Sequence, residues 1–108
     1  MFRVLITCAA MALPSLAQAQ EYTVLGAGNQ SCGSWVKKTT TRNFSLSWVL
    51  GFITAMNATE AIVTGKDPNV TEGTDANGVE LWITNYCSAN PLKTVSDATM
   101  RLYVALEK

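Results

Sequence analysis

Residues 75–92 read DANGVELWITNYCSANPL, and this stretch decides the fold. Thr74 or Asp75 is expected to cap a helix here, because a side-chain oxygen at that position accepts a hydrogen bond from an unpaired amide of the first turn. Asn90 is expected to end the helix and Pro91 to begin the next one, because a residue before proline avoids helical backbone angles. The apolar side chains recur every three or four residues and form one stripe: Val79, Trp82, Ile83, Tyr86 and Cys87.

A longer helix is predicted over residues 44–63, FSLSWVLGFITAMNATEAIV. Its apolar positions cover more than half of the circumference, which predicts a buried helix with neighbours on both sides. The alternative is a membrane span, but only about sixteen uncharged residues precede Glu60, fewer than the ~20 that a span requires. The remaining side of the helix carries small residues, which predicts that one neighbour approaches closely: Ser47, Gly51, Thr54, Ala58 and Ala61.

Glu60 is unusual because the helical periodicity places it between Val49 and Ile53, on the apolar side. We expect its carboxylate to reach solvent or a lysine near the helix end, since charged groups are rarely fully buried. The alternative is a partly buried, pH-sensitive group. Gly65 and Pro68 then predict the end of the helix and a polar loop that continues to about residue 75.

Two further helices complete the prediction of an all-α bundle with one short and three longer helices. Residues 31–38 predict a short helix capped by Ser31, which brings Cys32 to the core. Residues 39–42 are expected to form a polar linker. Residues 91–107 predict the last helix, whose apolar stripe is Leu92, Val95, Ala98, Leu102, Ala105 and Leu106.

The N-terminal residues have the pattern of a secretory signal peptide over residues 1–19. An apolar run over residues 4–13 is followed by small residues at Ala17 and Ala19, so cleavage is expected after Ala19 and a periplasmic location follows. Residues 20–30 are expected to form an arm that packs or frays, ahead of a helical domain over residues 31–108. The arm's Gly26-Ala27-Gly28 does not predict dinucleotide binding, because no βαβ unit surrounds it.

The composition of the mature chain argues against several classes of partner. Removing residues 1–19 removes Arg3, so seven Lys/Arg face eight Asp/Glu and the formal charge becomes −1. This balance predicts neither nucleic-acid binding nor affinity for anionic lipid. The two remaining cysteines, Cys32 and Cys87, favour a disulfide in a small exported chain. Such a disulfide would stabilise the fold by roughly 4 kcal/mol in the chain-entropy model.

The sequence carries no recognisable catalytic constellation. It contains no histidine, no phosphate-binding loop, no nucleophile elbow and no cluster of residues with metal-ligand spacing. Both mature thiols are used if the disulfide forms, and the scattered carboxylates are typical of a solvated surface. The chain is therefore predicted not to be an enzyme and to need neither a cofactor nor a metal.

The segment Tyr86-Cys87-Ser88-Ala89-Asn90-Pro91, together with Ser31-Cys32 and Ser47-Trp48, resembles the HdeA/HdeB family of small periplasmic proteins. The similarity spans Ser31 to about Leu106. It implies an all-α domain with a Cys32–Cys87 disulfide and a folded state that is often a homodimer. It also implies an acid-stress chaperone whose apolar surface becomes exposed at low pH. The glycine-containing arm and the long loop after Gly65 depart from the best-known members of the family.

Two functions are therefore carried forward. In the first, a holdase binds unfolded clients in acid; Trp35, Trp48, Phe52 and Trp82 would contact clients, although burial in the core is the expected alternative. The candidate pH-responsive carboxylates are Glu60, Asp75, Glu80 and Asp97, because a carboxylate that gains a partner on folding loses that stabilisation in acid. In the second, a periplasmic immunity protein binds one secreted effector through the 65–77 loop.

Overall fold

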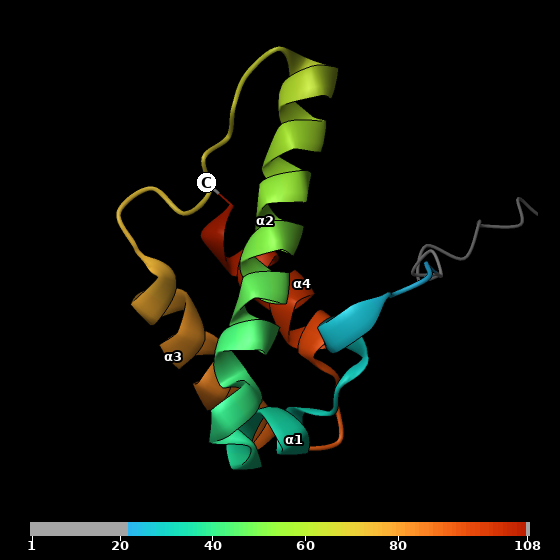
Figure 1. The fold of residues 1–108 in the computed structure, drawn as a ribbon. Coiled ribbons are helices and arrows are strands. Elements are labelled where there is room, and N and C mark those ends of the chain that lie inside the picture. Colours follow the sequence, from blue (N-terminus) through green and yellow to red (C-terminus); the bar gives the residue numbers. More distant parts are fainter. Residues whose placement is uncertain (1–21, 108) are drawn as a thin grey trace, which may run out of the picture.

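The computed structural model describes residues 22–107, so the predicted signal peptide at residues 1–19 lies outside the described residues. The described chain forms an all-α bundle (Figure 1) with one short and three longer helices, as predicted. No strand occurs within residues 22–107; an isolated antiparallel bridge joins Ser31 to Thr94. The helices are α1 (Cys32–Lys37), α2 (Arg42–Thr64), α3 (Ala76–Ala89) and α4 (Val95–Leu106), and the short 3-10 turns are η1 (Gly26–Asn29) and η2 (Thr39–Thr41).

Helix α3 forms where the amphipathic stripe predicted it. Asp75 caps its start by accepting a 2.9 Å hydrogen bond from the amide of Gly78, and Asn90 follows its last residue. Val79, Ile83 and Cys87 are buried, because residues at i, i+4 and i+8 lie on one face of a helix. The stripe thereby fixes which side of α3 faces the core.

Helix α4 begins four residues later than predicted. Pro91 does not start it; residues 91–93 form a turn, and Thr94 is the N-cap. Thr94 and Asp97 make a reciprocal capping box, with distances of 3.0 Å and 3.1 Å between side-chain oxygens and backbone nitrogens. This box satisfies two amides at once, which favours a start at Val95. Leu92, expected in the buried stripe, is consequently 96% exposed.

Helix α2 is longer than predicted by two residues at its start and one at its end, and it stops where Gly65 adopts φ 74°. The expectation that it has neighbours on both sides is wrong. Its buried residues lie on one face only: Ser45, Leu46, Val49 and Ile53. Among the described residues, no atom would lie within 4 Å of a Cβ at Gly51, and the small-residue side is exposed there.

The segment Thr39–Thr64, which contains α2, is long and apolar enough to cross a membrane. Only 17% of its most apolar window is buried, so the helix predicted to be a buried core helix is only partly buried. Core helices of soluble proteins pass the same test of length and composition, and a single such helix is weak evidence for a membrane span. Both charged residues of α2, Arg42 and Glu60, contact the bundle.

The N-terminal arm packs against the bundle from Tyr22 onward. The Tyr22 hydroxyl lies 3.0 Å from the Ser96 hydroxyl, and the Leu25 carbonyl accepts a 2.7 Å bond from the Trp48 indole. A Cβ at Gly28 would overlap the Trp48 ring, so the glycine allows the close approach of η1 to α2. Gly28 therefore has a packing role, whereas Gly26 adopts a positive φ of 75°.

Candidate functional site

The predicted disulfide between Cys32 and Cys87 joins α1 to α3, with the two Cα atoms 4.5 Å apart. Both cysteines are fully buried. Two backbone hydrogen bonds hold the same region: the amide of Cys32 donates to the Lys93 carbonyl at 2.7 Å, and the amide of Val95 donates to the Gln30 carbonyl at 2.9 Å. The start of α1 is thus tied to both α3 and the start of α4.

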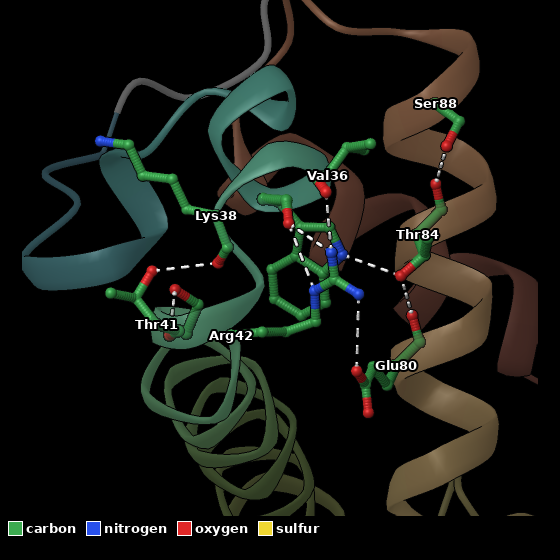
Figure 2. Close-up of polar contacts among 9 residues, drawn as sticks. Val36, Lys38, Thr41, Arg42, Glu80, Thr84 and Ser88 are labelled. Atoms are coloured by element: carbon green, nitrogen blue, oxygen red, sulfur yellow. Dashed lines mark hydrogen bonds and ion pairs between the residues drawn. The ribbon is translucent and has the colours of Figure 1, made fainter.

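Trp35 lies in the core at 1% exposure, so of its two predicted roles the structure shows the core one. Its indole nitrogen donates to the Thr84 hydroxyl of α3 at 2.9 Å (Figure 2). The Arg42 guanidinium lies 5.6 Å from the ring centroid and donates to the carbonyls of Trp35 and Val36 at 2.7 Å and 3.0 Å. Arg42 therefore fixes the start of α2 against the end of α1.

Glu80 connects α3 to the same arginine. Its Oε1 lies 3.7 Å from Arg42 Nη1, and the two side chains are 31% and 16% exposed. Figure 2 shows the Glu80 carboxylate directed from α3 toward the guanidinium. A partly exposed pair of this kind contributes about 0.5–1 kcal/mol. Glu80 is thus a protonatable contact between α2 and α3.

Glu60 provides the second such contact, with a partner that differs from the predicted solvent or lysine. Its Oε2 accepts a 2.9 Å hydrogen bond from the hydroxyl of Tyr103 on α4. The pKa of Tyr103 is raised from 10.0 to about 12. Burial is the largest cause, and the hydrogen bond to Glu60, the charge of Glu60 and the charge of Glu107 add to it. The hydroxyl therefore remains a donor throughout the physiological range.

Asp75 and Asp97, the other two candidate carboxylates, make only local contacts. Asp75 caps α3 and Asp97 belongs to the capping box of α4. Each therefore stabilises a helix end and joins no two helices. The four predicted carboxylates do not converge on one site, and only Glu60 and Glu80 bridge α2 to its neighbours.

The other three predicted aromatic residues lie at the edge of the core. Trp48 and Phe52 stack on α2 with ring centroids 5.4 Å apart, whereas Trp82 stacks on Tyr86 of α3 at 5.8 Å. All four rings are half-buried. Within residues 22–107, the structure thus leaves two separate aromatic pairs partly accessible.

The outer face of α2 was predicted to be covered by a neighbouring helix, and it is exposed instead. It consists of exposed residues spaced by three or four positions and carries no charge; we call it the outer α2 face, and it comprises Phe44, Ser47, Gly51, Ala55, Ala58 and Ile62. Phe44 is 72% and Ile62 is 85% exposed. A surface helix normally carries charged residues on its outer side. The absence of charge on this face was visible in the sequence, but its exposure among residues 22–107 was not.

Comparisons of the chain with protein-family models, curated proteins and solved structures returned no match. Within residues 22–107, no group of three or more His, Cys, Asp or Glu side chains is placed to hold a metal ion. The candidate functional site therefore rests on geometry: the outer α2 face, and the two carboxylate contacts that hold the inner side of the same helix.

Proposed function

We propose that the chain is a small exported, non-enzymatic chaperone of the holdase type that binds unfolded proteins in acid. The observation that carries this proposal is the position of the charges of α2. Arg42 and Glu60 are the only charged residues of α2. Arg42 pairs with the carboxylate of Glu80 on α3, and Glu60 accepts the hydrogen bond of Tyr103 with its own carboxylate. Acid therefore acts on the contacts that hold an otherwise uncharged helix.

Strong acid would act in two ways. Protonation of Glu80 removes the attraction to Arg42, and protonation of Glu60 weakens its acceptance of the Tyr103 hydrogen bond. At the same time, neutralising the eight carboxylates of the mature chain leaves its seven Lys/Arg charges unbalanced. Self-repulsion of this kind favours expanded states with exposed apolar surface.

Loosening of α2 would expose a surface suited to unfolded clients. Its inner residues Leu46, Val49 and Ile53 would join the uncharged outer α2 face, and the stacked Trp48–Phe52 pair lies on the same helix. Contiguous exposed apolar patches are typical of protein-binding surfaces. The disulfide would keep α1 and α3 together, because protonation does not break a sulfur–sulfur bond.

The experiment compares client aggregation with the pH at which an apolar dye binds. We expect protection of a model client from aggregation in strong acid and none at neutral pH. Glu60→Gln/Glu80→Gln imitates the protonated contacts and should shift dye binding and protection to higher pH. Glu107→Gln removes one exposed carboxylate whose charge also acts on Tyr103 but which takes part in neither of the two carboxylate contacts of α2, and it should shift dye binding and protection much less. Absence of protection at every pH, with no dye binding, would refute the proposal.

A second proposal is an immunity or inhibitor protein, and the loop between α2 and α3 favours it. Val70 is 4% exposed and anchors this otherwise exposed segment, in which Asn69 has φ 38°. A hollow of about 420 Å³ lies between the loop and the end of α4, lined by Glu60, Pro68, Val70, Leu106 and Glu107. Retention of one secreted effector at neutral pH, abolished by replacing loop side chains, would support this function over the first.

A further inference from the structure

The corner where α1 meets the turn at residues 91–93 gathers lysines around a projecting apolar side chain. Lys37 and Lys38 line a hollow of about 490 Å³ together with Ser34, Pro91 and Leu92, and Lys93 follows directly in the chain. Leu92 is 96% exposed, the largest value among the exposed large apolar side chains within residues 22–107. We call Lys37, Lys38, Leu92 and Lys93 the lysine corner.

The ammonium groups of the lysine corner are not used within the fold. Among residues 22–107, the single ion pair joins Arg42 to Glu80, and no side-chain hydrogen bond involves the three lysines. Figure 2 shows the Lys38 side chain extending away from Arg42 and Glu80. The acidic residue in the adjoining first turn of α4, Asp97, is occupied by its capping box.

The lysine corner is also held firmly. The amide of Gly33 donates to the Pro91 carbonyl at 3.0 Å, and the amide of Cys32 donates to the Lys93 carbonyl at 2.7 Å. Cys32 also forms the disulfide with Cys87. Leu92 is therefore presented by a fixed turn, and little ordering is required when it is buried by a partner.

The fold separates charges that the composition shows as nearly balanced. Acidic residues gather at the end of α2, in the loop after it and at the end of α4, where Lys66 is the one described lysine. The acidic residues are Glu60, Asp67, Glu72, Asp75 and Glu107. Figure 1 places the end of α2 and α1 at opposite ends of the molecule. Such a charge separation orients the lysine corner toward a negative surface.

We propose that the lysine corner docks the protein on an anionic phospholipid surface, with Leu92 inserted among the lipids. A bilayer accepts a single projecting leucine without a shape-matched pocket, and the lysine stems lie along it while their ammonium groups stay hydrated. An acidic protein partner would have to desolvate those groups instead. The docking is independent of the chaperone proposal, and it departs from the expectation, drawn from the balanced composition, that the chain has no affinity for anionic lipid.

The test measures partition onto vesicles of equimolar phosphatidylglycerol and phosphatidylcholine, and onto phosphatidylcholine alone, at low and at physiological ionic strength. All variants are expressed from the whole coding sequence, and mass spectrometry verifies that they share one N-terminus. We expect binding that requires phosphatidylglycerol and weakens with salt. Lys37→Gln/Lys38→Gln should lower the partition coefficient by about 25-fold, since each lysine contributes about fivefold. Leu92→Gln should lower it by about tenfold.

The matched controls make the same changes elsewhere. Lys66→Gln/Arg101→Gln alters the net charge identically, and Leu81→Gln replaces a leucine that is 62% exposed on α3; both should stay within about twofold of wild type. Lys38→Gln/Lys93→Gln is a second corner variant, and circular dichroism verifies that each protein folds. Equal losses in the controls, or no binding of the wild type to anionic vesicles at low salt, would overturn the proposal. So would capture of an acidic protein through Lys37 and Lys38 without vesicle binding.

Discussion

The two ends of α2 differ in how they are held. Around its start, the Trp35–Arg42 cluster, the disulfide and the backbone bridge between Ser31 and Thr94 connect all four helices. Near its other end, Glu60 bonds to Tyr103 and Val70 packs beneath the loop, while Ile62 is 85% exposed. Figure 1 shows the last turns of α2 extending beyond α3 and α4. Stability is therefore concentrated at the α1 end.

The largest test of this difference removes the covalent tie. Cys32→Ala/Cys87→Ala opens a loop whose ends are 55 residues apart, and we expect a loss of roughly 4 kcal/mol in the free energy of unfolding. Ile62→Ala, at the exposed end of α2, should change it by less than about 0.5 kcal/mol. Urea unfolding followed by tryptophan fluorescence measures both. Similar losses in the two variants would contradict the difference between the ends.

The second test uses two glycines that face opposite surroundings. Gly28→Ala forces a methyl group into the Trp48 ring and should destabilise by about 1–3 kcal/mol. Gly51→Ala meets no atom within 4 Å on the outer α2 face and should stabilise by about 0.5–1 kcal/mol, because alanine is the better helix former. Thermal unfolding gives the sign of each change. A stabilising Gly28→Ala would mean that η1 does not rest on Trp48.

The third test concerns the contact nearest the far end of α2. Tyr103→Phe removes the donor to Glu60 and should cost about 1–2 kcal/mol at neutral pH. Because the pKa of Tyr103 is raised to about 12, its contribution is fully present below pH 10 and is lost as the pH rises through 12. The phenylalanine variant should lack that alkaline loss. Tyr22→Phe, at a half-exposed tyrosine, should retain it.

The smallest expected effect belongs to the pair that bridges α2 and α3. Glu80→Gln should lower the free energy of unfolding by about 0.5–1 kcal/mol at low salt and by less at high salt. A double-mutant cycle with Arg42→Met isolates the ion pair from the carbonyl contacts of the arginine. A coupling energy unaffected by salt would show that the two side chains interact through packing.

The sequence was sufficient for the local features of the fold. Caps lie within three residues of the amides they satisfy, so the starts of α1 and α3 were predicted within one residue. The disulfide followed from two cysteines in a small chain that is predicted to be exported. The start of α4 was misplaced because Pro91 gave a plausible local signal, while the stronger Thr94–Asp97 capping box was overlooked.

The features that depend on distant residues were not predictable in the same way. Tyr103 lies 43 residues from Glu60, and no periodicity within α2 indicates that partner. The pattern of small residues shows that one face of α2 avoids charge, but it does not show whether a neighbour covers that face. No role was predicted for Gly28 from the sequence, and the large side chain that requires a glycine there, Trp48, lies twenty residues away.

The contacts that join residues 30–32 to residues 87–95 have a consequence for the order of folding. The amide of Val95 bonds to Gln30, and Cys32 bonds to both Lys93 and Cys87, so the early residues obtain these partners only after most of the chain exists. Helix α2 can form locally, but the start of α1 obtains its covalent and backbone partners only when residues 87–95 are present. Docking of α1 is therefore expected only after residues 87–95 are available, and a chain truncated before Lys93 should remain open.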